Sequence, residues 1–191
     1  EEKMKEWDID FVGIDNVIPD GMVRSQNHVE AVVNHFKNNC IDALFIPHCN
    51  FGTEGAAGMI AHKLNVPTLL WGPRDTAPLP DGTRLRDSLC GLFATSKVLH
   101  KLGVKFTYIE NCDIDDPAFT NGFDKFIRTA NIVRKARNMK IGQIGQRIDF
   151  FWTTIINESE LLEKYGVEIL PIDMVEFIQL TKKLAEDRKD I

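Results

Sequence analysis

Two short segments of the chain combine residue types that suit recognition of a polar ligand. In the first, HCNFGTEG at residues 48–55, a glycine turn leads into a run of small residues typical of a helix. Backbone N–H groups at the start of a helix can bind an anion or a polyol hydroxyl group. An ordinary tight turn, with Thr53 as the N-cap residue, is the alternative. The candidate ligand-binding residues are His48, Asn50, Phe51 and Thr53.

The glycine spacing of this segment matches neither G-x-G-x-x-G nor the P-loop pattern, so a dinucleotide site and a P-loop are both excluded.

The second segment, WGPRDTAPLPDGTRLRDSLCG at residues 71–91, follows an apolar run and is rich in proline, arginine and aspartate. Guanidinium and carboxylate groups offer donors and acceptors in fixed planes, which suits hydroxyl recognition. Salt bridges within the pairs Arg74–Asp75 and Arg86–Asp87 would instead stiffen the loop, at about 0–1 kcal/mol each. Asp87 or Ser88 is also a candidate N-cap residue. The candidate ligand-binding residues are Arg86, Asp87 and Ser88.

The adjacent residues His48 and Cys49 raise the question of a metal site or a nucleophile. Zinc sites need three or four spaced ligands, and the other histidines lie in helical patterns without that spacing. A catalytic cysteine would need an orienting partner and an oxyanion hole, and no motif marks either. We therefore expect neither a metal site nor a nucleophile at His48 and Cys49, and we interpret His48 as a polar group that lines a pocket or as a hydrogen-bonded loop histidine.

A third segment, GQIGQRIDFFW at residues 142–152, follows a later strand-like run. Arg147 and Asp149 are its polar candidates for a pocket. Phe150, Phe151 and Trp152 are expected to lie in a core or an interface and to be among the least exposed aromatic residues.

Apolar runs of strand length alternate with helical patterns through the first part of the chain. Strands are expected at residues 9–14, 42–47, 66–71 and 105–110. Helices are expected at residues 26–38, 54–64, 86–102 and about 117–137, with Gly103 closing the third of them. Strands separated by helices indicate crossover connections and a parallel sheet. The sequence thus predicts an α/β domain with a doubly wound, Rossmann-like or flavodoxin-like sheet.

The last quarter of the chain restarts this alternation. Strands are expected at 140–145 and 167–170, and helices at 158–165 and 172–184. Two strands do not make a stable sheet. We therefore expect a first α/β domain at 1–138, short of its N-terminal strand, and the start of a second α/β domain at 139–191. A fragment of this kind should self-associate, through residues 141–170 or the rim of the first domain.

Three loops, at residues 15–25, 48–53 and 72–83, share one edge of the predicted sheet, which we call the rim. Ligands of such sheets bind outside the carboxyl ends of the strands. Both candidate segments therefore fall where this architecture places its sites.

Bulk properties narrow the functional classes. The net charge of −5 gives no support for binding nucleic acid or an anionic membrane, and no apolar run is long enough to span a bilayer. The four cysteines lack C-x-x-C spacing, so we expect reduced thiols and a cytoplasmic protein.

Six segments, in order along nearly the whole chain, carry a family resemblance: PDGMV (19–23), NFGTEG (50–55), VPTLLWGPRD (66–75), GTRLRDSLCG (82–91), KIGQIGQR (140–147) and YGVEILPIDMVE (165–176). Together they resemble the N-terminal region of the L-fucose/L-arabinose isomerase superfamily, in its fucose-isomerase-like branch. The pair LLWGPRD and RLRDSLCG is the most specific part.

The resemblance implies an enzyme that interconverts an aldose and its ketose. A divalent cation, typically Mn²⁺, binds adjacent sugar oxygens, and two carboxylates move a proton through an enediol. The family's metal ligands lie in its later half, so the resemblance assigns no catalytic or metal residue here, and the chain alone is expected to be inactive.

The resemblance also implies homo-oligomers in which a neighbouring N-terminal domain closes each sugar pocket. His48, Asn50 and Phe51 match a loop that lines this pocket, and the loop with Arg86 is a second contributor. Fucose isomerases proper carry a tryptophan just before the glycine turn, where this chain has Pro47 and His48. The sugar therefore stays open.

Two other functions stay open from the residues alone. The chain could be a non-catalytic sugar-binding or regulatory module, or a piece that serves mainly in oligomer assembly. Metal-binding Glu, Asp and His residues elsewhere in the protein would favour the enzyme over the binding module.

Overall fold

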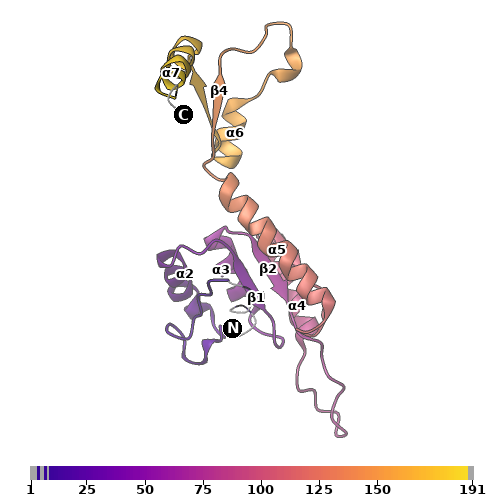
Figure 1. The fold of residues 1–191 in the computed structure, drawn as a ribbon. Helices are drawn as coiled ribbons and strands as arrows, with labels where there is room; N and C mark the ends of the chain where they lie inside the picture. Colours follow the sequence, from indigo (N-terminus) through magenta and orange to yellow (C-terminus); the bar gives the residue numbers. More distant parts are fainter. Residues whose placement is uncertain (1–3, 5–6, 8, 189–191) are drawn as a thin grey trace. The chain divides into compact units, whose positions relative to one another are not determined.

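The computed structural model of the 191-residue chain describes residues 4, 7 and 9–188 (Figure 1). The chain divides into two compact units, Glu1–Asn131 and Ile132–Ile191. The division falls inside helix α5 (Pro117–Ala136), a little before the position 138/139 suggested by the sequence.

The first unit contains a parallel sheet whose described strands are β1 (Leu44–Pro47), β2 (Thr68–Trp71) and β3 (Phe106–Tyr108). Their order is β1-β2-β3, so β2 is paired along both edges. This confirms the predicted α/β class and three of the four expected strands. The doubly wound topology stays a prediction.

Among the described residues, the helices that pack with this sheet are α2 (Val29–Asn38), α3 (Glu54–Leu64), α4 (Ser88–Lys101) and α5. Short 3₁₀ turns, η1 (Pro19–Gly21) and η2 (Gln26–His28), precede α2. The expected helices are confirmed to within a few residues. Gly103, with a φ of 69°, follows α4 in the left-handed conformation that commonly ends helices.

Successive residues of each strand enter two different hydrophobic cores, as the alternation of a strand requires. Leu44 and Leu70 belong to a core formed with α2, α3 and α4. Phe45 and Leu69 face the other core, where Trp71 lies 4.6 Å from Phe119 of α5 between ring centroids. Aromatic residues thus hold α5 against the sheet.

The expected strand at residues 9–14 is not a strand in the structure. A strand exists only where its backbone groups find a ladder partner. No described residue forms a ladder with this run, although Ile9 and Val12 pack against the two cores. The run is apolar and contacts the cores, but the strand pairing that a ladder requires is missing among the described residues.

The second unit contains a two-stranded parallel sheet of β4 (Lys140–Ile144) and β5 (Glu168–Ile172). Helix α6 (Glu158–Tyr165) ends at Gly166, whose φ is 67°. Helix α7 (Met174–Asp187) begins at Asp173, which accepts hydrogen bonds from the backbone N–H groups of Val175 and Glu176. These elements confirm the restarted alternation, and η3 (Trp152–Thr154) is the remaining short turn.

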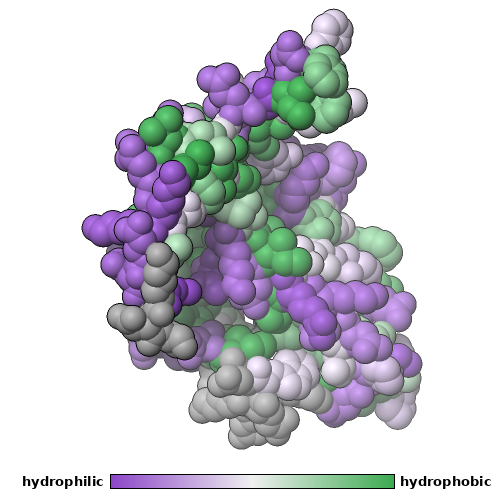
Figure 2. Space-filling view, turned by 45° about the horizontal axis from the view of Figure 1, so that its top comes forward, coloured by the Kyte–Doolittle hydropathy of each residue, from purple (hydrophilic) through white to green (hydrophobic). Residues whose placement is uncertain are grey.

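The expectation that Phe150, Phe151 and Trp152 are among the least exposed aromatic residues is wrong for the single chain. Their exposed fractions are 72%, 48% and 75%. They lie in the loop between β4 and α6, and the narrow sheet of this unit offers no core large enough to cover them. Figure 2 shows hydrophobic residues among hydrophilic ones at the surface of the molecule.

None of the described helices is both long enough and apolar enough to cross a membrane.

The central strand of the first unit gives a direct test of its core. Leu69 is fully buried in β2, so Leu69→Ala should lower the free energy of unfolding by about 2–5 kcal/mol. Val175, which is 61% exposed in α7, offers a control whose change to alanine should cost less than about 0.5 kcal/mol. Urea denaturation measures both, and equal losses would contradict this assignment of the core.

Candidate functional site

The loops that follow the three strands lie at one edge of the sheet. The ladder continues past the strand ends, because the His48 N–H donates to the Trp71 carbonyl (2.7 Å) and the Ile109 N–H to the Leu70 carbonyl (3.1 Å). The residues after β1, β2 and β3 therefore leave the sheet side by side. This is the edge where parallel α/β sheets hold their ligands.

His48 is buried beneath the loop that it begins, with an exposed fraction of 6%. Its Nε2 shares a hydrogen bond of 2.7 Å with the Oγ1 of Thr95, a buried hydroxyl of α4. Burial lowers the pKa of His48, although nearby backbone groups and the charge of Glu54 act in the opposite direction. A neutral, buried His48 braces the loop against α4 in this chain.

Asn50 joins the loop after β1 to the start of α4. Its Oδ1 accepts hydrogen bonds from the N–H of Phe51 (2.9 Å) and the N–H of Asp87 (3.1 Å). Gly91 of α4 permits the close approach, because a Cβ there would lie 2.5 Å from the Phe51 carbonyl oxygen. The loop and the helix are thus fitted to one another.

Asp75 caps α4 from a loop 13 residues earlier in the chain. Its Oδ1 accepts from the Ser88 N–H (2.8 Å) and its Oδ2 from the Leu89 N–H (3.0 Å). The first N–H groups of a helix lack partners within it, and a carboxylate also complements the helix dipole. Asp87 occupies the N-cap position but makes no side-chain cap hydrogen bond, so the expected capping by Asp87 or Ser88 is corrected.

The environment of Asp75 favours its charged form. Desolvation acts to raise the pKa of Asp75, but the Leu89 and Ser88 amides, with the nearby charge of Arg86, together hold that pKa below its ordinary value. The carboxylate is therefore ionised at neutral pH and is committed to the helix start.

The arginines of the loop after β2 also have partners other than those expected. Arg74 pairs with Asp116 at 3.1 Å, and Arg86 donates to the Arg74 carbonyl at 3.0 Å. Asn111, after β3, donates its side-chain amide to the carbonyls of Gly72 (3.1 Å) and Pro73 (2.7 Å). The loop after β2 is therefore held from both sides, rather than by Arg–Asp pairs between adjacent residues.

Thr53 connects the site to the loop at residues 15–25. Its hydroxyl donates to the Arg24 carbonyl (3.0 Å), whereas its side chain makes no cap hydrogen bond to α3. Arg24 in turn forms an ion pair with Asp20. The three loops predicted to share one rim are thus linked by hydrogen bonds.

Exposure decides which of these groups a ligand can reach. Phe51 is 49% exposed and Asn50 is exposed, while Arg86 and Asp87 are half-buried. Ser88 is fully buried, and only its amide enters the cluster, through Asp75. Of the candidate ligand-binding residues, a ligand of the single chain can therefore reach one aromatic ring together with amide, guanidinium and carboxylate groups.

Cys49 is exposed on the same rim but is poorly suited to nucleophilic attack. Although the residue is exposed overall, partial desolvation of its thiol raises the pKa of Cys49, and the charge of Arg86 opposes this effect. The thiolate is the reactive form of cysteine. All four cysteines are free thiols in the structure.

Arg147 and Asp149 belong to the second unit and interact locally. The Arg147 guanidinium donates to the carbonyls of Ile148 (2.9 Å) and Asp149 (2.7 Å), and the Asp149 carboxylate accepts from the Phe150 N–H (2.7 Å). These contacts order the loop after β4, and the pocket role of both residues stays a prediction.

Among residues 4, 7 and 9–188, no group of three or more His, Cys, Asp or Glu side chains is placed to hold a metal ion. The donors of the rim already serve the backbone of α4 and of the loops. The side chains of the described residues therefore do not fit a resident metal centre.

Sequence reasoning missed several residues that build the rim: Thr95, Gly91, Asn111 and Asp116. Asn111 follows the third strand, so the rule that sites lie at strand ends would have pointed to it. Thr95 and Gly91 lie inside a helix pattern and carry no local signal of a partner in another loop.

The fold and the rim define a class: a parallel α/β domain with hydrogen-bonding groups fixed at the carboxyl ends of its strands. Residues 2–137 match the family model described as the fucose/sulfoquinovose isomerase N-terminal domain. The chain therefore belongs to this family, as the sequence resemblance had indicated.

Curated proteins similar to this chain include sulfoquinovose isomerases. A sulfoquinovose isomerase of Clostridium sp. (strain MSTE9) is 28% identical over 150 residues, which cover 78% of this chain and 33% of that protein. A sulfoquinovose isomerase of Priestia aryabhattai is 25% identical over 171 residues, covering 89% and 37% respectively. The chain thus spans about a third of the length of the curated relatives that it matches.

The Asp75 cap predicts a defined loss of stability. Asp75→Asn should lower the free energy of unfolding at pH 7 by about 0.5–2 kcal/mol, since an amide nitrogen would face one helix N–H. Because the folded-state pKa is depressed, the carboxylate stabilises above the unfolded value of about 3.9 and loses this effect as pH falls through the folded value. The difference between variant and wild type should therefore shrink in acid.

Asp87→Asn is the matched control, since Asp87 sits at the N-cap position without a cap hydrogen bond. Urea denaturation between pH 7 and pH 3 measures both variants. Equal losses for the two, or a loss at Asp75 that is independent of pH, would contradict the assigned cap.

Proposed function

We propose that this chain is the N-terminal part of an aldose–ketose isomerase and that its rim forms one wall of the sugar pocket. Residues 48–53 and 86–88 are the segments in contact with sugar, and a neighbouring subunit of a homo-oligomer completes the site. The catalytic carboxylates and a divalent cation, typically Mn²⁺, are held by residues outside this chain. Such a cation would bind and polarise adjacent sugar oxygens.

One observation carries the proposal. Two segments chosen from sequence as ligand-binding, and separated by more than 30 positions, are joined directly by the hydrogen bond from the Asp87 N–H to Asn50. They meet at the carboxyl edge of the sheet in a chain of the fucose/sulfoquinovose isomerase family. The closeness of the two segments supports a shared role.

The chemistry of the rim suits a sugar. A polyol offers many hydroxyl groups, so specificity depends on donors and acceptors that are fixed in place. Hydrogen bonds to Asn50, Asp75 and Asn111 fix the loops, which reduces the ordering that binding would require. Phe51 adds an exposed apolar ring beside these groups.

We propose sulfoquinovose as the first sugar to test, because the similar curated proteins are named sulfoquinovose isomerases. This sugar carries an anionic sulfonate group. The Arg86 guanidinium has five N–H donors, and the structure shows a hydrogen bond from one of its nitrogens, to the Arg74 carbonyl. Arg86 is therefore the cation of the rim that we assign to substrate contact.

The test uses the full-length protein that contains this chain. Arg86→Ala should raise KM or lower kcat for ketose formation by about 10- to 100-fold, the range expected for a charge-assisted hydrogen bond. The protein should stay folded, because Arg86 lies outside both hydrophobic cores and its loss removes only a hydrogen bond at the surface of the loop. Arg128→Ala, at an exposed ion pair on α5, is the matched control.

The assay compares sulfoquinovose with L-fucose and other aldoses in the presence of Mn²⁺. Normal kinetics together with a melting temperature several degrees lower would show that Arg86 is structural. If the wild-type protein binds these sugars in calorimetry but converts none of them, the non-catalytic sugar-binding module replaces the enzyme.

A further inference from the structure

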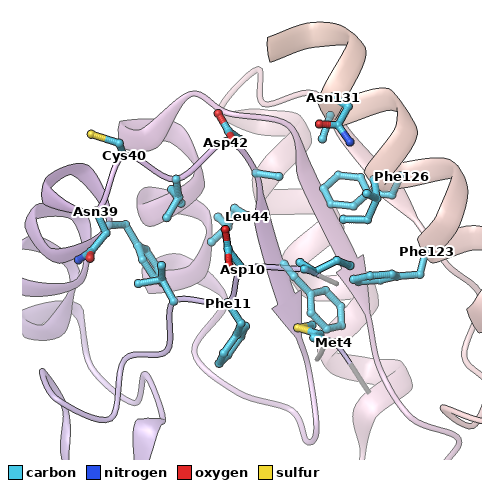
Figure 3. Close-up of a pocket in the computed structure, with 18 residues that line it drawn as sticks. Met4, Asp10, Phe11, Asn39, Cys40, Asp42, Leu44, Phe123, Phe126 and Asn131 are labelled. Atoms are coloured by element: carbon cyan, nitrogen blue, oxygen red, sulfur yellow. The ribbon is translucent and has the colours of Figure 1, made fainter. Parts of the chain in front are cut away.

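Beneath the rim, His48 and Thr95 form a buried polar pair that a ligand cannot reach in the single chain. Their exposed fractions are 6% and 0%, and Nε2 of His48 lies 2.7 Å from Oγ1 of Thr95. A pocket of about 440 Å³ in the same unit is lined in part by residues of α2, β1 and α5, and neither member of the pair lines it (Figure 3). The pair therefore lies apart from that pocket and directly under the loop that follows β1.

Glycines from three segments enclose His48. A Cβ on Gly52, whose φ is 73°, would lie 2.9 Å from Cε1 and Nδ1 of the His48 ring. A Cβ on Gly91 of α4 would lie 3.0 Å from Nδ1, and one on Gly72 would lie 2.6 Å from the His48 carbonyl oxygen. Contacts this close are tighter than ordinary packing allows, so His48 fits only because none of the three residues has a side chain. The loop, α4 and the end of β2 together fix its position.

The hydrogen bonds of the ring define which nitrogen of His48 carries the hydrogen. Burial lowers the pKa of His48, and backbone hydrogen bonding to Asn50 and Phe51 opposes this effect. The carbonyl oxygens of these two residues lie on the Nδ1 side of the ring, because a Cβ on Gly91 would meet all three atoms. A carbonyl oxygen can only accept, so Nδ1 donates in the neutral ring and Nε2 accepts from the Thr95 hydroxyl.

This chain of contacts leads from α4 to two residues that a ligand can reach. Phe51 is 49% exposed and Asn50 is exposed, while their carbonyl oxygens face the buried ring. Without the Thr95 hydroxyl, Nε2 of His48 would be a buried acceptor with no donor, which is costly. The ring would then turn or move its hydrogen to the other nitrogen, and either change would shift the loop that carries Phe51.

We propose that Thr95 is a positioning residue for sugar binding: its hydroxyl orients His48, and His48 sets the conformation of residues 50–52 that presents Phe51 and Asn50 to the ligand. The inference rests on the proposed function, since it takes the ligand of the rim to be a sugar. A loop that is already in its bound conformation loses less freedom when the ligand arrives. Thr95 therefore acts on the affinity for the sugar and not on the chemical step.

The test measures sulfoquinovose conversion by the full-length protein in the presence of Mn²⁺. Thr95→Val removes the hydroxyl and should raise KM by about tenfold while kcat stays within about twofold, because the wall binds the sugar equally in the ground and transition states. Thr95→Ser keeps the hydroxyl and loses a buried methyl group, so its KM should stay within about threefold of wild type. If the protein binds sulfoquinovose without converting it, the Kd from calorimetry replaces KM.

Thr68 gives the matched control for a merely structural role. It is 1% exposed at the start of β2, opposite the rim, and its hydroxyl donates to the Val66 carbonyl (3.0 Å). Thr68→Val and both Thr95 variants should lower the melting temperature, since each removes a buried group. Only Thr95→Val should raise KM. A KM that rises in step with the loss of stability in all three variants would overturn the inference.

The ring can also be displaced from the side of the loop. Gly52→Ala places a methyl group against the His48 ring and should raise KM by about tenfold. Gly82→Ala is its control, because Gly82 has a similar φ of 85° but nothing lies within 4 Å of the position of its Cβ. Equal KM values for these two variants would contradict the role of the ring, even if Thr95→Val failed to fold.

Hydrogen exchange reports on the loop without any sugar. The Phe51 N–H, bonded to the Asn50 side chain at 2.9 Å, should exchange about tenfold faster in Thr95→Val. The Thr83 N–H is bonded to the Asp81 side chain at the same distance in an exposed loop, and it should keep its rate.

The outcomes separate this inference from the proposed function. If Phe51→Ala raises KM but Thr95→Val changes neither KM nor the exchange of the Phe51 N–H, the positioning role is overturned and the sugar wall stands. If neither Phe51→Ala nor Arg86→Ala changes KM, the proposed function is overturned and this inference with it.

Discussion

An inner strand of a parallel sheet is hydrogen-bonded along both edges and covered on both faces, and how far each strand meets this condition distinguishes the two units of the chain. In the first unit β2 meets it fully, with β1 and β3 beside it and a core on each face. β1 is covered on both faces and paired with β2 along one edge, whereas its other edge borders a pocket. In the second unit β4 and β5 have only each other among the described residues, and large apolar side chains around them stay exposed.

The same parallel arrangement creates the rim, because it brings the chain out of the sheet repeatedly at one edge. Three loops leave there, and side chains rather than further strands hold them together. Asp75 and Asn50 are the main connections, since each joins its own loop to the start of α4 through backbone N–H groups. The start of α4 is already capped by the Asp75 carboxylate, which disfavours a second anion there. The proposed contact with an anionic sugar is therefore assigned to the Arg86 side chain.

Local patterns were sufficient to predict most elements of the fold. The period of the apolar residues and the glycines that end helices placed α3, α6 and the strands β1 to β5 close to where they are observed. The strand predicted at residues 9–14 is wrong because a strand depends on a pairing partner elsewhere in the chain, and the period of apolar residues does not reveal that partner. The predicted burial of the aromatic residues at 150–152 is wrong for a related reason, since a hydrophobic side chain is buried only if a core surrounds it.

For the candidate site, the sequence indicated the right loops but not their internal connections. The rule that sites lie at the carboxyl ends of strands selected residues 48–53 and 86–88. The partners Asp75–Ser88, Asn50–Asp87 and His48–Thr95 depend on how loops and helix meet in space. Thr53 and Asp87 occupy N-cap positions but make no cap hydrogen bond. The Thr53 hydroxyl donates to the Arg24 carbonyl instead, and Asp75 accepts from the first N–H groups of α4.

A crystal structure of the full-length protein with a bound sugar would show directly whether the rim lines the sugar pocket. We expect Phe51 and Arg86 of one subunit to contact a sugar whose reacting carbons are held by a neighbouring subunit. A sugar bound without any contact from residues 48–53 or 86–88 would contradict it.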